Sequence, residues 1–123
     1  MKVRGIRGAI TVSKNDEEEI LAATKELFLQ ICQENHLQAE DVASIFITVT
    51  QDLNATFPAK AIRSQPNWAL VPVMCAVEVD VPGGLEKCIR LLIHVNTDLP
   101  QDQIRHVFLR KAIDLRPDLM GGK

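Results

Sequence analysis

Hydrophobic and polar residues alternate along much of this chain, which is typical of β-strands that bury one face. The clearest case is Cys88–Val95, where Ile89, Leu91 and Ile93 fall on one face of an extended backbone and Arg90 falls on the other. A last extended segment is predicted over residues 106–115. Alternation and β-branched residues together predict four strands, at 3–12, 42–50, 73–79 and 87–96.

One long stretch follows the helical period instead. Apolar residues recur there at spacings of three and four, which predicts a helix over residues 16–35. Asn15 and Glu18 have the spacing of a capping box at its start. A short helix is predicted over residues 57–63, which has a proline early in its first turn. Turns are predicted at 38–41, 82–84, 100–103 and 116–119.

This order of elements predicts an α+β fold, a mixed β-sheet with one long and one short helix. No linker or internal repeat divides the 123 residues, so one domain over residues 1–123 is expected. Two such helices cannot cover both faces of the sheet. We therefore expect the uncovered face, or the sheet edges, to pack against another subunit.

Three charged residues interrupt apolar strand segments: Arg90, Glu78 and Arg7. Burying a guanidinium without a partner costs several kcal/mol, so an anionic ligand is expected beside Arg90. Lone charges on rigid strands are a way to build a polar pocket. Structural alternatives stay open, since Arg90 could reach water from an edge strand, Glu78 could pair with an arginine, and Arg7 could lie on the surface.

Composition mainly excludes function classes. A net charge of −2 gives no electrostatic basis for binding nucleic acid or an acidic membrane, and no apolar run has the length of a membrane span. Cys32, Cys75 and Cys88 lack the spacing of a disulfide framework or a zinc site, and the first residues leave no room for a targeting peptide, so the cytoplasm is expected. No motif for a nucleophile, a nucleotide or a metal occurs. An enzyme with this sequence is therefore expected to act by positioning and electrostatics.

Several blocks nevertheless resemble one known family in order and spacing. They are Val-Arg-Gly-Ile-Arg-Gly-Ala at 3–9, Phe-Pro-Ala-Lys-Ala-Ile-Arg at 57–63, Gly-Gly-Leu-Glu-Lys-Cys-Ile-Arg at 83–90, the segment 95–109, and Leu-Arg-Pro-Asp-Leu at 115–119. With these blocks the chain resembles, almost end to end, the monofunctional chorismate mutases of the Bacillus type.

The resemblance implies a homotrimer, a pseudo-α/β-barrel with one site at each subunit interface. It implies a single chorismate mutase domain that converts chorismate to prephenate, a Claisen-type [3,3] rearrangement within one molecule, on the route to phenylalanine and tyrosine. No cofactor and no metal are implied. The substrate is a dicarboxylate, which agrees with arginines in a pocket on an acidic protein.

The resemblance also implies a role for each matching position. Arg90 would donate to the ether oxygen as negative charge develops there, and Arg7 would hold a carboxylate. Glu78 and the backbone near Cys75 would bind the ring hydroxyl. The pocket would be lined by Phe57, Ala59, Lys60, Val73, Met74, Phe108 and Leu115, with Arg63 and Arg116 at its mouth.

Two positions depart from the family pattern. Phe108 stands where the family usually has tyrosine, and this chain contains no tyrosine at all, so weaker substrate binding with turnover largely kept is expected. Met74 stands where a smaller polar residue is common, and little effect is expected because its backbone is what matters. The glycine-rich end, residues 120–123, is expected to be mobile.

Two other functions stay open. One is a trimeric module that binds small acids and has lost catalysis, for which Phe108 is the sequence support. The other is an enamine or imine deaminase of the small trimeric barrel kind, although the C-terminal pattern of that family is missing here. Turnover of chorismate separates the enzyme from the binding module, and competition by chorismate or prephenate separates both from the deaminase.

Overall fold

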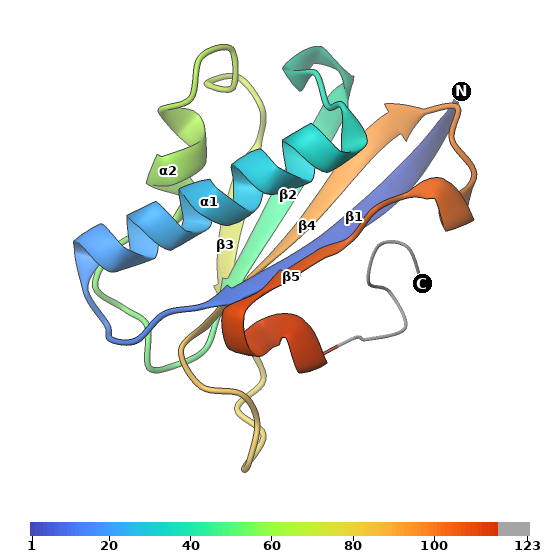
Figure 1. Ribbon diagram of the computed structural model, residues 1–123. Helices are drawn as coiled ribbons and strands as arrows, with labels where there is room; N and C mark the ends of the chain where they lie inside the picture. The colour runs from blue at the N-terminus through green and yellow to red at the C-terminus, as the bar shows by residue number, and fades with distance from the viewer. Residues whose placement is uncertain (116–123) are drawn as a thin grey trace.

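The computed structural model describes residues 1–115, which form five strands, two α-helices and three short 3-10 helices (Figure 1). None of the described helices is long and apolar enough to cross a membrane. The turn predicted at 116–119 and the tail at 120–123 lie outside the described residues. The elements are β1 (Lys2–Thr11), α1 (Glu17–Asn35), η1 (Ala39–Asp41), β2 (Val42–Val49), α2 (Ala59–Arg63), β3 (Val73–Val77), β4 (Cys88–Thr97), η2 (Gln101–Gln103), β5 (Val107–Leu109) and η3 (Arg110–Asp114).

The strands form one mixed sheet in the order β3-β2-β4-β1-β5. The central strand β4 runs antiparallel to β1 and β2, while β3 pairs in parallel with β2 and β5 in parallel with β1. This is the α+β fold that the element order predicts. Helix α1 crosses one face of the sheet with α2 beside it (Figure 1), and among the described residues no α-helix covers the opposite face, here called the open face.

The core lies between the sheet and α1. Phe28 of α1 is fully buried and meets Trp68 edge-on, with ring centroids 4.7 Å apart. Gly8 lets α1 approach β1 closely, because an added Cβ would lie 2.6 Å from Cδ1 of Ile31. The predicted inward face of β4 is confirmed, since its four alternate apolar residues are 0–3% exposed: Ile89, Leu91, Ile93 and Val95.

The start of α1 differs from the predicted capping box by one residue. Asp16 is the N-cap, and its carboxylate accepts from the backbone N–H of Glu19. The Glu19 carboxylate accepts from the hydroxyl and backbone N–H of Ser13, and these hydrogen bonds lower the pKa of the Glu19 carboxyl. Asn15 is used elsewhere, since its Oδ1 accepts from the backbone N–H groups of Asn54 and Ala55.

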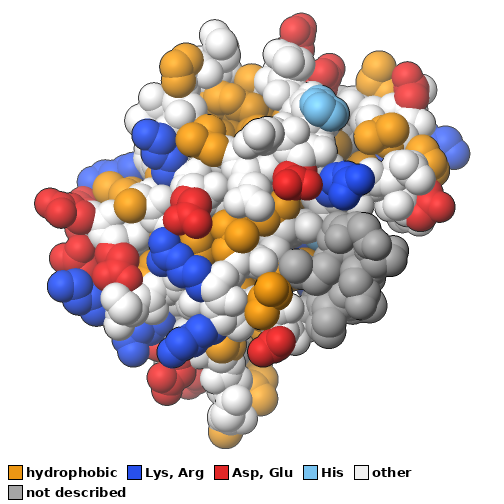
Figure 2. Space-filling view, viewed as in Figure 1, with side chains coloured by type: hydrophobic (Ala, Val, Ile, Leu, Met, Phe, Trp, Pro, Cys, Tyr) orange, Lys and Arg blue, Asp and Glu red, His pale blue; other side chains and the backbone are white. Residues whose placement is uncertain are grey.

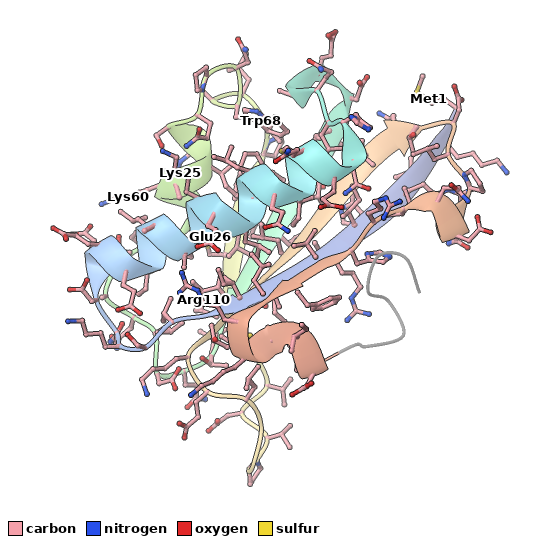
Figure 3. The ribbon with its side chains drawn as sticks, viewed as in Figure 1. Met1, Lys25, Glu26, Lys60, Trp68 and Arg110 are labelled. Carbon is pink, nitrogen blue, oxygen red and sulfur yellow. The ribbon has the colours of Figure 1, made fainter. Side chains whose placement is uncertain are left out.

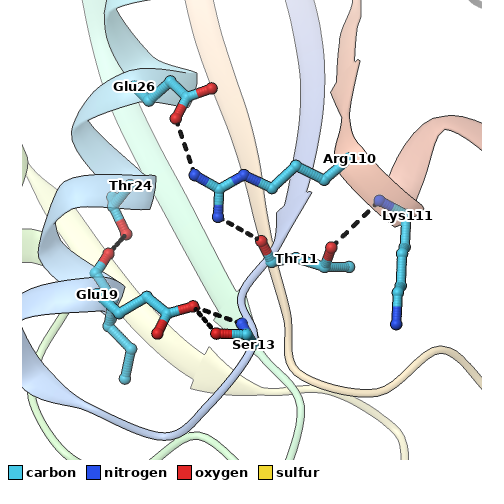
Figure 4. A network of polar contacts seen from close by, with 8 residues as sticks. Thr11, Ser13, Glu19, Thr24, Glu26, Arg110 and Lys111 are labelled. Carbon is cyan, nitrogen blue, oxygen red and sulfur yellow. Dashed lines mark hydrogen bonds and ion pairs between the residues drawn. The ribbon is translucent and has the colours of Figure 1, made fainter.

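The extended segment predicted over 106–115 is wrong in its second half. Strand β5 ends at Leu109, and Arg110 takes a left-handed backbone conformation (φ 57°) that turns the chain into η3. The Arg110 guanidinium donates to the Thr11 carbonyl and to Glu26 Oε1, both at 3.0 Å, and the Lys111 N–H donates to the Thr11 hydroxyl (Figure 4). These contacts hold η3 against the end of β1.

The two faces of the sheet present different surfaces. Over the covered face, charged side chains of both signs are spread around α1 (Figure 2). The open face exposes apolar residues instead, since Phe46 is 41% exposed and Met74 of the edge strand is 63% exposed. An open apolar face agrees with the expectation that another subunit covers it.

Candidate active site

The register of the strands gathers polar side chains at the middle of the open face. Arg90 of β4 is paired with Ala9 of β1 on one side and with Thr48 of β2 on the other. Ala9 is in turn paired with Phe108 of β5. Arg90, Thr48 and Phe108 therefore lie in one row across the sheet, and the small Ala9 separates the arginine from the aromatic ring.

A groove of about 620 Å³ lies over this row. Arg7 lines it from β1, two positions along the strand from Ala9. An adjoining hollow of about 730 Å³ runs on toward the loop of residues 79–86 and shares three of the groove's residues. The residues common to both are Glu78, Arg90 and Leu115.

Two cations and one anion line the groove. Glu78 Oε2 accepts from the Thr48 hydroxyl and lies 3.7 Å from Arg90 Nε. Glu78 comes directly after β3 rather than within it, but its backbone N–H still donates to the Val49 carbonyl at 2.8 Å. With Arg7 the groove carries a net positive charge, which favours an anionic ligand.

The structure bears on each structural alternative for Arg90, Glu78 and Arg7. Arg90 does not extend into water from an edge strand, because β4 is the central strand. Glu78 does pair with an arginine, and that arginine is Arg90, whose side chain is 39% exposed against 25% for Glu78. Arg7 is half-buried on the open face, so it is not simply a surface residue.

A small apolar cluster supports one wall of the groove. Phe108 is 5% exposed and packs with Ala9, Cys88 and Ala112, with Leu115 against them. Burial raises the pKa of the Cys88 thiol, although the nearby Arg90 guanidinium acts in the opposite direction. Cys88 is therefore a neutral packing residue that fixes the place of Phe108.

The predicted site residues of α2 lie far from this groove within one chain. Phe57, Ala59, Lys60 and Arg63 belong to α2 or to the residues before it, on the covered face of the sheet. Lys60 projects from α2 beside α1 (Figure 3), where its ammonium lies 3.3 Å from Glu17 Oε2. The chain thus brings together only part of the predicted set.

The predicted residues of β3 are divided between the two faces. Val73 and Cys75 pack against the core on the covered face, while Met74 lies on the open face next to Phe46. A role for Cys75 through its backbone is compatible with this packing, and a role for its thiol in the groove is not. Arg116 lies outside the described residues.

Thr48 and His106 belong to the site region but were not among the predicted site residues. Thr48 is a polar residue inside an apolar strand, the same signal that singled out Arg90, and it lines the groove. His106 accepts at Nδ1 from the backbone N–H of Arg7, and a lone histidine before a short strand gives no such signal.

The fold and the groove together define a mixed-sheet protein whose open face carries a groove lined by two arginines and one glutamate. A sequence model of the family described as chorismate mutase type I matches residues 3–119. The chain belongs to this family and is a chorismate mutase.

Individual relatives cover nearly the whole chain. It is 56% identical over 119 residues to the chorismate mutase AroH of Bacillus subtilis (strain 168), spanning 97% of this chain and 94% of the relative. It is 52% identical over 118 residues to the chorismate mutase AroH of Thermus thermophilus, spanning 95% and 96%. A solved chorismate mutase from Clostridium thermocellum superposes with a TM-score of 0.86 at 49% identity, covering 89% of this chain and 96% of that one.

Proposed function

We propose that this enzyme converts chorismate to prephenate at the groove of the open face, without a metal or a cofactor. The observation that carries the proposal is the meeting of Arg7, Arg90 and Glu78 in one groove. In the rearrangement the ether C–O bond breaks as a new C–C bond forms within the same molecule. The protein then needs to supply positioning and a favourable electrostatic field.

Each charged residue has one proposed task. Arg90 donates to the ether oxygen, where negative charge builds up in the transition state, so its hydrogen bond strengthens as the barrier is approached. Arg7 holds a carboxylate by charge-assisted hydrogen bonds. Glu78 accepts from the ring hydroxyl, and the contacts from Thr48 and Arg90 hold its carboxylate in place.

We propose further that the enzyme is a homotrimer in which neighbouring subunits complete each site. The split of the predicted residues supports this, since the α2 residues of one chain are remote from its own groove. Exposed apolar side chains support it as well: Phe57 is 70% exposed, Met74 63% and Val77 61%. A second subunit that buries them would bring Lys60 and Arg63 to the dicarboxylate.

The proposed setting is aromatic amino acid biosynthesis in the cytoplasm. Cys32, Cys75 and Cys88 are all free thiols, which is compatible with a reducing compartment. Cell fractionation with an antibody against the protein tests this part separately. Recovery of the protein from a secreted fraction would contradict it.

The first experiment follows the loss of chorismate absorbance with purified protein and a chelator, with prephenate identified as the product. We expect turnover with the chelator present. Saturable binding of chorismate without turnover would instead favour the binding module, which Phe108 supports.

Analytical ultracentrifugation tests the trimer, and a monomer that turns over at full rate would contradict sites shared between subunits.

A further inference from the structure

We propose that His106 is a positioning residue for Arg7, holding the Arg7 backbone where strand pairing does not. The inference rests on the proposed role of Arg7 in binding a substrate carboxylate. Strand β1 is held differently on its two sides. Along β4, β1 is paired over its whole length, whereas its pairing with β5 runs from Gly8 to Ile10.

Arg7 lies one residue before the β5 ladder begins. If the parallel pairing of β1 with β5 continued by one more residue, the Arg7 N–H would donate to the Arg105 carbonyl. That carbonyl accepts instead from Asn35 Nδ2, at 2.8 Å. The Arg7 N–H donates to Nδ1 of His106, at 2.9 Å, so the imidazole takes the place of the missing ladder bond.

The segment that presents His106 is itself fixed. Asn35, at the end of α1, is 9% exposed and bonds Arg105 in both directions, because its Oδ1 accepts from the Arg105 N–H at 2.9 Å. Its Nδ2 also donates to the Ile31 carbonyl. A chain of contacts therefore runs from α1 through Arg105 and His106 to the backbone of Arg7.

The contact matters because Arg7 lines the groove just before the point where β1 begins to pair with β5. A guanidinium at the end of a long side chain binds a carboxylate well when its backbone is held still. The carboxylate is bound in both the ground state and the transition state, so a displaced Arg7 weakens both alike. Loss of the His106 contact is therefore expected to raise KM and leave kcat nearly unchanged.

Three substitutions separate this role from general packing. His106→Asn keeps an acceptor oxygen at the place of Nδ1, His106→Gln moves the acceptor toward the place of Nε2, and His106→Leu keeps bulk without an acceptor. We expect KM to rise about tenfold in His106→Leu, and clearly in His106→Gln, with kcat within about twofold of the original. His106→Asn should retain nearly the original KM. Equal KM values for His106→Asn and His106→Gln would overturn the inference, and this pair decides the matter even if His106→Leu does not fold.

A double-mutant cycle with Arg7→Ala provides the control. If His106 acts through Arg7, His106→Leu changes KM by less than about twofold in the Arg7→Ala background. An effect as large as in the native background would overturn the inference. If the Arg7→Ala single variant has a normal KM, the proposed role of Arg7 is contradicted. If Arg7→Ala raises KM but His106→Leu does not, the role of Arg7 stands and only the inference about His106 is overturned.

Discussion

The two faces of the same sheet are built from the same strands but have different tasks. Beneath α1, Ile10 of β1 and Ile93 of β4 are completely buried. On the open face of these strands, Arg7 and Arg90 line the groove. Because successive strand residues point to opposite faces, one strand supplies core packing from one set of positions and groove-lining groups from the other. Changes on the two faces should therefore appear in different measurements.

The largest effect is expected on the open face, at Arg90. Replacing Arg90 with alanine should lower kcat about 10²- to 10³-fold, since it removes the proposed donor to the charge that develops at the ether oxygen. The urea midpoint of unfolding should change little. Arg4→Ala is the matched control, because Arg4 binds the Leu99 carbonyl and does not line the groove. Equal losses of activity in the two variants would contradict the role of Arg90.

The covered face should show the opposite pattern. Leu27→Ala removes a completely buried side chain of α1 and is expected to cost about 2–5 kcal/mol of unfolding free energy. Leu29→Ala makes the same chemical change at a position that is 42% exposed, and a much smaller cost is expected. Urea denaturation at a fixed protein concentration measures both. Similar midpoints for the two variants would show that burial under α1 does not control stability.

A third prediction concerns the position that departs from the family. Phe108→Tyr restores a hydroxyl that can bond a substrate carboxylate, a contact worth roughly 1.5–3 kcal/mol before competing water and arginines reduce it. KM should fall by about tenfold while kcat stays nearly constant, as uniform binding requires. Steady-state kinetics of the two proteins side by side decide it. An unchanged KM would mean that Phe108 does not weaken substrate binding.

A fourth prediction tests how the carboxylate of Glu78 is held. Thr48→Val removes the hydroxyl that donates to Glu78 and keeps the shape of the side chain. We expect kcat/KM to fall about tenfold, since a hydrogen bond to a charged group is lost. Thr48→Ser keeps the hydroxyl and should stay close to the original value. A Thr48→Ser variant as poor as Thr48→Val would point to packing by the methyl group instead.

The smallest effect is expected where charges meet at the surface. Glu26→Gln removes the ion pair with Arg110, whose side chains are 50% and 43% exposed, and should cost less than about 1 kcal/mol. Figure 3 shows the two side chains facing each other between α1 and η3. Thermal unfolding at low and high salt measures the change. A loss of several kcal/mol would mean that this pair, and not the Thr11 contacts of Figure 4, holds η3 in place.

Local patterns predicted most elements because helix and strand periods are properties of neighbouring residues. The helix over 16–35 and the inward face of β4 are confirmed within a residue or two. Element ends were less accurate. Several neighbouring polar and acidic residues could have served as the N-cap of α1, and the local pattern does not select among them. Strand β5 ends earlier than predicted because the Arg110 side chain bonds Thr11 and Glu26, which are far away in the chain.

Sequence by itself determined that Arg7, Glu78 and Arg90 are unusual, since a charge in an otherwise apolar segment is visible without any structure. Tertiary structure alone decided that the three share a groove, because strand order and register come from pairing between distant segments. It also decided that the α2 residues lie apart from that groove, and that His106 reaches the backbone of Arg7. Such contacts depend on where separate elements meet, which no local period encodes.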